Sequence, residues 1–373
     1  MRLLLLLALL LPSLALGQVG PQPPAAAARS WLLLDYGSRL TLAGANADLR
    51  VEPASLTKLM TAYVSFAALK AGKIKGTQSA PVSEKAWKAP GSRMFIEPKL
   101  AVSVDELLRG MIVQSGNDAC IALAELIAGS EAAFVQSMNS EAQRLGLTNT
   151  HFSNATGLPD AQHYSTAKDL GFLALALIRD FPEYYTLYSL KEFRYNGITQ
   201  PNRNRLLWLD ASVDGVKTGH TEGAGFCLIA SAKRGPRRLL SVLLGADSDS
   251  ARAQESQKLL NFGFQNYDAV KLYDARHAIA QLRVFKGREN AVGAGFSDDL
   301  LVSVPSGQSA QLKVQLQPRH PLLAPIAAGS QVATLKLTLG DKPYGEFPVL
   351  ALESVPAAGF FGRLWDAFLL LFQ

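Results

Sequence analysis

Cysteine is nearly absent from this 373-residue chain, which has only Cys120 and Cys227. Two cysteines exclude a disulfide framework, although one bridge between them stays open. Both are more typical of small buried residues than of a reactive pair. The five histidines are scattered and show no metal-binding spacing such as H-E-x-x-H, so we expect neither a metal nor another cofactor.

The chain also lacks a basic tract, a fixed-period repeat and a glycine-rich phosphate loop. Its net charge of +6, with 18% charged residues, therefore does not indicate nucleic-acid binding. Glycine and proline are ordinary in number, and 48% hydrophobic residues exclude a disordered or collagen-like chain. The length suffices for one large domain and a smaller one.

Only the N-terminus carries a long apolar run, since residues 1–17 read MRLLLLLALLLPSLALG. An early arginine, an apolar stretch, and small residues at Ala15 and Gly17 are typical of a secretory signal peptide cut before Gln18. We therefore expect secretion across the cytoplasmic membrane to the periplasmic, or extracytoplasmic, side. No other run reaches the ~18–20 apolar residues that would span a bilayer.

The C-terminal residues 358–373 predict an amphipathic helix. Its apolar positions recur at helical spacing: Phe361, Leu364, Trp365, Phe368 and Phe372. At ~24 Å such a helix is too short to span the membrane, so we expect it to lie in the membrane interface as a peripheral anchor. Docking of this helix on its own domain is the alternative.

Between the two ends, residues 25–274 alternate strand-like runs (SWLLLDY, FCLIASAK, RLLSVLLGA) with helical stretches. The latter are Ser55–Ala71, Val104–Ile127, Glu131–Leu145, Thr166–Ile178 and Ala251–Asn266. Strands at both ends with helices between them predict an α+β domain, with an antiparallel sheet beside a helical subdomain. Residues 275–355 instead show short alternating runs separated by turn residues, which predict a small all-β domain, a sandwich.

Three short motifs occur in order: Ser55-Leu56-Thr57-Lys58, Ser115-Gly116-Asn117 and Lys217-Thr218-Gly219. Ser55 and Lys58 share a helix face, so a neutral lysine could take the serine proton for acyl transfer. The pKa of a free lysine is about 10.4, so burial and a second cation are needed to favour the neutral form. Lys217 is the candidate for that cation.

This ordered set is the signature of penicillin-binding proteins and serine β-lactamases. With the segments GSRMFIEP, LLRGMIVQSGNDACIALAE, NTHFSNATGLPD and VDGVKTGHTEGAGFCLIASA, nearly the whole mature chain resembles the serine-type D-alanyl-D-alanine carboxypeptidases. These are the low-molecular-mass penicillin-binding proteins of peptidase family S11. The resemblance implies a β-lactamase/transpeptidase-like domain, peptidoglycan pentapeptide stems as substrate, β-lactams as covalent inhibitors, and a role in cell-wall remodelling and cell shape.

The resemblance also implies residue roles. Ser55 is the acylated nucleophile, Lys58 its general base and Ser115 a proton relay. Asn117 bonds the substrate amide, and Lys217 lies on the strand at the sheet edge.

Further substrate-binding roles come from the same resemblance. Thr218, beside Gly219, contacts the substrate carboxylate, which Arg252 orients. Arg203 lies beneath the active site. The backbone N–H groups of Ser55 and His220 form the oxyanion hole.

Three other functions remain open. A β-lactamase of class A needs a glutamate that activates water, but no glutamate occurs in residues 142–182, where Asp160 and Asp169 stand instead. We therefore expect slow release of penicillin. A D,D-endopeptidase of the same superfamily and a non-catalytic peptidoglycan-binding scaffold are the other two. Whether Lys58 or Ser115 dominates the proton path of deacylation also stays open.

Overall fold

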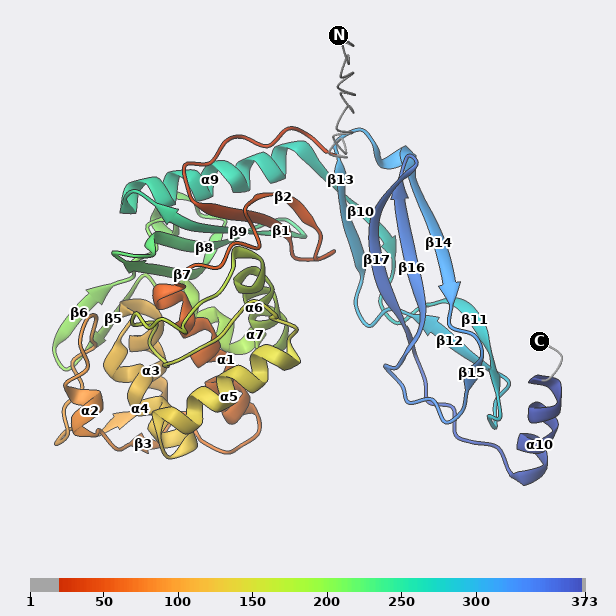
Figure 1. Cartoon of the computed structure of the whole chain (residues 1–373), viewed down its shortest axis with the longest axis horizontal. Coiled ribbons are helices and arrows are strands. Elements are labelled where there is room, and N and C mark those ends of the chain that lie inside the picture. Colours follow the sequence, from red (N-terminus) through yellow and green to blue (C-terminus); the bar gives the residue numbers. More distant parts are fainter. Residues whose placement is uncertain (1–19, 371–373) are drawn as a thin grey trace, which may run out of the picture.

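The computed structural model describes residues 20–370, so the predicted signal peptide lies outside the described residues. Figure 1 shows two domains. The larger first domain contains a five-stranded sheet, and the β domain extends away from the first domain as an arm. A short helix, α10 (Phe360–Leu369), lies at the far end of this arm. The arm therefore separates the first domain from the C-terminal helix.

The first domain is built on an antiparallel sheet whose strands follow the order β2-β1-β9-β8-β7. These strands are β1 (Ser30–Asp35), β2 (Thr41–Ala45), β7 (Val213–Thr221), β8 (Gly225–Arg234) and β9 (Arg237–Ala246). Alternation along β1 sends Leu32 and Leu34 into one core and Trp31 and Leu33 into another. Both faces of the sheet are therefore buried, as the apolar runs of its central strands predict.

Helices cover both faces of this sheet. The long helix α9 (Asp249–Asn266) packs on one face, together with the short helix α8 (Leu206–Leu209), whose leucines join the same core. The other helices form a subdomain on the opposite side (Figure 1). These are α1 (Lys58–Lys70), α2 (Glu84–Trp87), α3 (Val104–Arg109), α4 (Asn117–Ala128), α5 (Glu131–Arg144), α6 (Ala167–Asp180) and α7 (Pro182–Tyr185). Side chains of Ser130, Thr166 and Ser248 cap α5, α6 and α9, which explains where these helices begin.

Two short hairpins complete the first domain. One pairs β3 (Ser79–Ala80) with β4 (Val102–Ser103), and the other pairs β5 (Glu192–Tyr195) with β6 (Ile198–Pro201).

The predicted helix Val104–Ile127 is wrong as a single element. The chain leaves α3, passes through a π-helical segment, Gly110–Gln114, and breaks at Ser115, whose φ of 67° is left-handed. Helix α4 then begins at Asn117. Apolar periodicity on both sides of the break made it invisible in the sequence. The consequence is that the second motif stands at a junction between helices.

The β domain has two sheets. Strands β10 (Tyr267–Tyr273) and β13 (Leu300–Pro305) form one, and the other has the order β14-β16-β17-β12-β11-β15. Its strands are β11 (Ala278–Phe285), β12 (Ala291–Gly295), β14 (Leu312–Pro318), β15 (Leu322–Leu323), β16 (Gln331–Leu339) and β17 (Lys342–Ala351). Because β10 pairs with β13, the chain enters this domain at Tyr267, earlier than the predicted boundary after residue 274.

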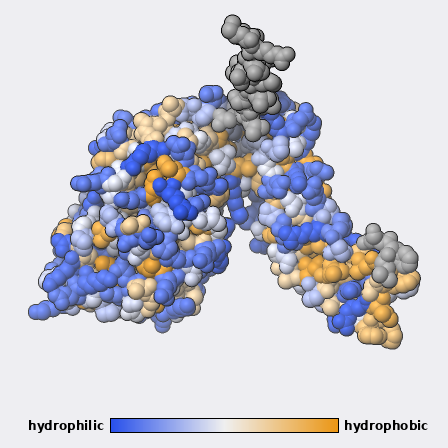
Figure 2. Space-filling view, in the orientation of Figure 1, coloured by the Kyte–Doolittle hydropathy of each residue, from blue (hydrophilic) through white to orange (hydrophobic). Residues whose placement is uncertain are grey.

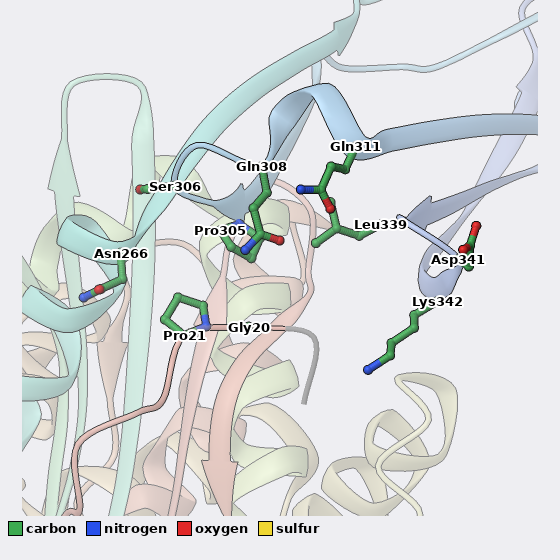
Figure 3. Close-up of a pocket in the computed structure, with 10 residues that line it drawn as sticks. All are labelled: Gly20, Pro21, Asn266, Pro305, Ser306, Gln308, Gln311, Leu339, Asp341 and Lys342. Atoms are coloured by element: carbon green, nitrogen blue, oxygen red, sulfur yellow. The ribbon is translucent and has the colours of Figure 1, made fainter. Parts of the chain in front are cut away.

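The two domains are joined by buried polar contacts. The Ser303 hydroxyl donates to the Asp35 carboxylate at 2.6 Å, and the Arg237 guanidinium donates to Ser303 Oγ at 3.2 Å. A solvent-open cavity of about 610 Å³ lies beside this junction, lined by Asn266 at the end of α9, by Pro21, and by polar residues of the β domain (Figure 3). The contacts fix the direction in which the arm leaves the first domain.

Helix α10 attaches to the β domain by its polar side, since the Asp366 carboxylate accepts the backbone N–H of Lys286. Its apolar side chains are exposed, and Figure 2 shows them gathered at this end of the molecule: Phe360, Phe361, Leu364, Trp365 and Phe368. Across residues 20–370, no helix combines the length and apolar character needed to cross a membrane.

Candidate active site

The first motif forms the start of a helix. Ser55 lies in a 3₁₀ turn, Ala54–Thr57, which runs directly into α1 at Lys58. Ala54 holds a φ of 47°, a left-handed conformation that costs free energy for a residue with a Cβ. The turn places Lys58 Nζ 3.0 Å from Ser55 Oγ, so the predicted serine–lysine pair is formed.

Lys58 is fully buried, and two oxygens besides Ser55 Oγ surround its amine. Nζ donates to Asn117 Oδ1 at 2.7 Å and to the Thr156 carbonyl oxygen at 2.5 Å. A neutral amine has two N–H groups and one lone pair. Because both oxygens can only accept, they take the two N–H groups, and the lone pair then faces Ser55 Oγ. This arrangement suits a base that removes the Ser55 proton.

The second motif faces this pair from the helix junction. Asn117 Nδ2 donates to the Pro90 carbonyl at 2.7 Å, which fixes the orientation of its amide. The Ser115 hydroxyl is buried and has no hydrogen-bond partner among the described residues. An unpaired buried hydroxyl costs free energy, and such groups are retained mainly where function needs them.

Asp118 stiffens the wall beside the second motif. Its buried carboxylate accepts the backbone N–H groups of Met94, Phe95 and Ile96 at 2.8–3.2 Å. The backbone N–H of Asn117 in turn donates to the Ser92 carbonyl at 2.7 Å. The loop around residues 90–96 is thus bonded to the start of α4, a role for Asp118 that the motif search did not include.

The third motif lies on β7, the edge strand of the sheet. A Cβ at Gly219 would lie 3.2 Å from the Pro53 carbonyl oxygen and 3.3 Å from Ala54 Cβ, so this strand passes directly over the Ser55 turn. Lys217 and Thr218 are buried, and Lys217 Nζ donates to the Thr218 carbonyl at 3.0 Å. His220 is exposed, with its ring 4.1 Å from the ring of Phe226. An edge strand leaves backbone groups free for a ligand.

Burial lowers the pKa of Lys58, which favours its neutral form; Cys120 and Asp118 oppose this shift, and the nearby Arg203 adds to it. Burial also lowers the pKa of Lys217 to well below its ordinary value, and repulsion from Lys58 adds to that shift. Lys58 and Lys217 repel each other when both are charged, so Lys217 as the cation that favours neutral Lys58 stays a prediction. Arg203 is a further cation that lowers the pKa of both lysines.

The two arginines differ in exposure. Arg203 is exposed and lies close enough to both lysines to lower their pKa values, and its place beneath the active site stays a prediction. Arg252 is buried, donates to the Gly219 carbonyl at 3.1 Å and pairs with Asp249. It therefore supports β7 from α9, and its contact with a substrate carboxylate stays a prediction.

The loop that supplies the Thr156 carbonyl is fastened to α1. Ser153 donates its backbone N–H to His163 Nδ1 at 3.2 Å, so the other ring nitrogen carries hydrogen and donates to Thr57 Oγ1 at 2.8 Å. Burial lowers the pKa of His163 to about 4, so this histidine is neutral near pH 7. Thr61 Oγ1 adds a bond to the Ala155 carbonyl at 2.6 Å.

Both cysteines are buried free thiols, so the bridge that had stayed open is not formed. Burial raises the pKa of Cys120 to about 12 and that of Cys227 to about 11, which makes both thiols unreactive near pH 7. Among the residues that the structure describes, no three candidate ligands come together to hold a metal ion.

Sequence reasoning missed Thr156, His163 and Asp118. Thr156 acts through a backbone carbonyl, which every residue has, so no motif could reveal it. Asp118 follows the second motif directly, and its position next to Asn117 was a usable signal.

A serine beside a buried lysine, with a serine and an asparagine on one wall and a lysine-bearing edge strand on the other, defines the active-serine acyl-transfer class. Comparison with known proteins narrows this class. Residues 18–248 match the family model of D-alanyl-D-alanine carboxypeptidase, and residues 267–357 match that of the C-terminal domain of penicillin-binding protein 5.

Individual relatives cover almost the whole chain. D-alanyl-D-alanine carboxypeptidase DacC of Escherichia coli (strain K12) is 45% identical over 360 residues, which is 94% of this chain and 90% of that protein. The structure of penicillin-binding protein 5 from Haemophilus influenzae superposes with a TM-score of 0.81 at 41% identity, covering 90% of this chain and 100% of that one.

A more distant structure covers the first domain. Penicillin-binding protein D2 from Listeria monocytogenes, in its ampicillin-bound form, gives a TM-score of 0.60 at 31% identity over 64% of this chain and 98% of that one. The chain therefore belongs to the D-alanyl-D-alanine carboxypeptidase family of penicillin-binding proteins. It is a hydrolase whose carboxypeptidase activity serves peptidoglycan remodelling.

Proposed function

We propose that this chain is a serine-type enzyme that removes the terminal D-alanine from peptidoglycan pentapeptide stems through an acyl-enzyme on Ser55. The observation that carries the proposal is the amine of Lys58, held by two obligate acceptors with its lone pair toward Ser55 Oγ. Nothing about this arrangement requires a cofactor.

In the proposed reaction, Ser55 Oγ attacks the carbonyl carbon of the penultimate D-alanine while its proton passes to Lys58 Nζ. Two backbone N–H groups, predicted at Ser55 and His220, stabilise the oxyanion. The C–N bond then breaks, and the leaving amine takes a proton from Lys58 directly or through Ser115. Water next attacks the ester, and its proton returns by the same groups to Ser55. A β-lactam acylates Ser55 in the same way.

Release of D-alanine from diacetyl-Lys-D-Ala-D-Ala tests the proposal. The parent protein releases D-alanine and binds labelled penicillin covalently, whereas Ser55→Ala does neither. Release by Ser55→Ala at the parent rate would refute the serine mechanism.

Penicillin hydrolysis should be slow. Two carboxylates of the helical subdomain are committed elsewhere: Asp118 accepts four backbone N–H groups, and Glu131 accepts the N–H of Ala155. Neither is hydrogen-bonded to Ser55 or Lys58, so we expect no efficient base for a deacylating water of the β-lactamase kind. Turnover of a cephalosporin and of a cross-linked peptide dimer, measured beside the pentapeptide, separates the β-lactamase and endopeptidase alternatives.

The place of action is part of the proposal: the signal peptide sends the chain out of the cytoplasm, and α10 holds it on the membrane surface. The support is that α10 bonds its own domain through Asp366 and leaves its aromatic side exposed. Deletion of residues 359–373 should move the protein from the membrane to the soluble fraction, with activity on small peptides intact. Unchanged membrane association would refute the anchor.

A further inference from the structure

A side-chain hydrogen bond joins the segment that precedes Ser55 to the end of β7. The Thr221 hydroxyl donates to the Glu52 carboxylate at 2.8 Å, between residues that are 169 positions apart in the sequence. Thr221 Oγ1 in turn accepts the backbone N–H of Ala224 at 2.9 Å, so the turn after β7 is bonded to the same hydroxyl. Neither Glu52 nor Thr221 belongs to the three motifs.

The glycine at position 223 leaves room for this carboxylate. A Cβ at Gly223 would lie 2.5–2.9 Å from the three carboxyl atoms of Glu52, which is too close unless the carboxylate moves. The φ of Gly223 lies outside the left-handed region, so the glycine is needed for space and not for backbone conformation. The Arg29 guanidinium also donates to the Gly223 carbonyl at 2.7 Å, which adds a second bond to this turn.

The backbone on either side of Glu52 is held independently of its side chain. Val51 exchanges two backbone hydrogen bonds with Ser165, at 2.9 and 3.0 Å. The Pro53 carbonyl accepts the N–H of Leu56 at 3.0 Å, which closes the 3₁₀ turn of the first motif. The Glu52 side chain therefore extends to β7 from a fixed point on the backbone.

Two contacts with this segment lie on either side of His220 along β7. Before His220, Gly219 lies against the Pro53 carbonyl, where an added Cβ would be 3.2 Å from the oxygen. After His220, Thr221 donates to Glu52. The first contact limits how closely the strand can approach, because atoms repel each other at short distance. The second contact is attractive and resists separation of the strand from the segment.

The oxyanion hole that we predict spans the same gap. It requires the N–H groups of Ser55 and His220 to converge on one oxygen, and these groups belong to the two segments that Glu52 joins. We propose that Glu52 is a positioning residue for this oxyanion hole, because its bond to Thr221 holds β7 at the distance from Ser55 that lets both N–H groups bind the developing negative charge. The inference rests on the proposed function, since it requires acylation of Ser55.

Acylation by excess labelled penicillin tests the inference. Stopped-flow measurement gives the acylation rate constant at saturating penicillin and the Kd of the complex that precedes acylation. In Glu52→Ala, we expect the rate constant to fall by about tenfold, less than the 10²–10³-fold cost of losing a whole donor, while Kd stays within about twofold. Glu52→Gln keeps an oxygen that accepts the Thr221 hydroxyl, so it should restore most of the rate. A parent rate constant in Glu52→Ala would overturn the inference.

Gly223→Ala breaks the same bond from the other side. The added methyl group meets the end of a flexible side chain and not the backbone, so the fold should persist while the Glu52 carboxylate is displaced. The acylation rate constant should fall here too. The double variant Glu52→Ala/Gly223→Ala should be no slower than Glu52→Ala, because the methyl group then meets no carboxylate. Losses that add in the double variant would contradict a shared cause.

Two matched controls should acylate at the parent rate. Glu222→Ala removes an exposed carboxylate from the same turn, and Gly76→Ala adds a Cβ where no atom lies within 4 Å. Partial misfolding lowers the amount of acyl-enzyme formed but not its rate constant, so a loss of amplitude alone in Glu52→Ala would mean a structural role and would overturn the inference. If the proposed function fails, the parent itself forms no covalent adduct with penicillin, and the inference falls with it.

Discussion

The two domains bury different kinds of side chain. Among the described residues, almost every buried polar or charged side chain lies in the catalytic domain, including Lys58, Asp118 and Lys217. The β domain buries one, Ser303, and that hydroxyl bonds Asp35 of the catalytic domain. The core of the β domain is otherwise apolar.

This difference indicates that the first domain carries the catalytic chemistry and that the β domain supports it. Burying charge costs free energy, so the catalytic domain bears a cost that its reaction requires. Among the described residues, the β domain buries no charged side chain. It places α10 at its far end, away from the first domain (Figure 1). Substitutions in the catalytic cluster should therefore change rates, and substitutions in the β core should change stability.

The largest expected effect is that of Lys58→Met. Acylation by penicillin should slow by about 10²–10⁴-fold, because the general base is lost. The free energy of unfolding should change by less than about 2 kcal/mol, since removing a buried amine offsets the two acceptors left at Asn117 and Thr156. Stopped-flow acylation and chemical denaturation measure the two quantities. A large loss of stability with little loss of rate would contradict the comparison.

Leu335→Ala should show the opposite pattern. Leu335 is buried in the β core, so its truncation should lower the stability of that domain by about 2–5 kcal/mol. The kcat/KM for a small soluble peptide should stay within about twofold of the parent. The control Val314→Ala, on the exposed edge strand β14, should cost less than about 0.5 kcal/mol. A tenfold loss of kcat/KM in Leu335→Ala would show that the β core shapes the active site.

The same distinction explains what sequence reasoning could reach. Residues whose side-chain chemistry is needed, such as Ser55, Lys58 and Asn117, could be recognised from the spacing of the motifs. The structure brings these three side chains together. Their individual roles in substrate binding stay predictions. The role of the Thr156 carbonyl could not be predicted, because every residue has a carbonyl and only the course of the folded backbone brings this one to Lys58.

Tertiary placement was also hard to predict. The break at Ser115 was hidden by apolar periodicity on both sides, and nothing local distinguishes the exposed Arg203 from the buried Arg252. Alternation predicted five strands of the β domain: β11, β13, β14, β16 and β17. It did not reveal β10, β12 or β15, and the predicted boundary after residue 274 left β10 in the preceding domain.

His163 should make the two domains respond differently to acid. Its pKa is about 4 when folded and about 6.5 when unfolded, so the unfolded chain binds the proton first as pH falls. The catalytic domain should lose stability between pH 6.5 and 4, by about 3 kcal/mol, and His163→Gln should remove this loss. Asp160 opposes the shift, while His151 and Lys58 contribute to it.

His163 lies in the catalytic domain, so its protonation should leave the stability of the β domain unchanged. Thermal unfolding followed by domain-specific probes from pH 7 to 4 gives both slopes. An unchanged acid slope in His163→Gln would contradict the assignment.

The smallest expected effect concerns Arg203, the exposed cation that helps to lower the pKa of Lys58. Arg203→Ala removes that repulsion, so the pKa of Lys58 rises and the ascending limb of the pH profile for acylation moves to higher pH. Because Arg203 is exposed, the shift should stay below about one pH unit, and added salt should screen it. Salt should therefore move the parent profile toward that of Arg203→Ala and leave the variant almost unmoved, while Arg203→Lys should keep the parent behaviour. A shift of the variant profile to lower pH would mean that Arg203 raises the pKa of Lys58 and does not lower it. The proposed electrostatic difference between the catalytic domain and the β domain would then be wrong for this residue.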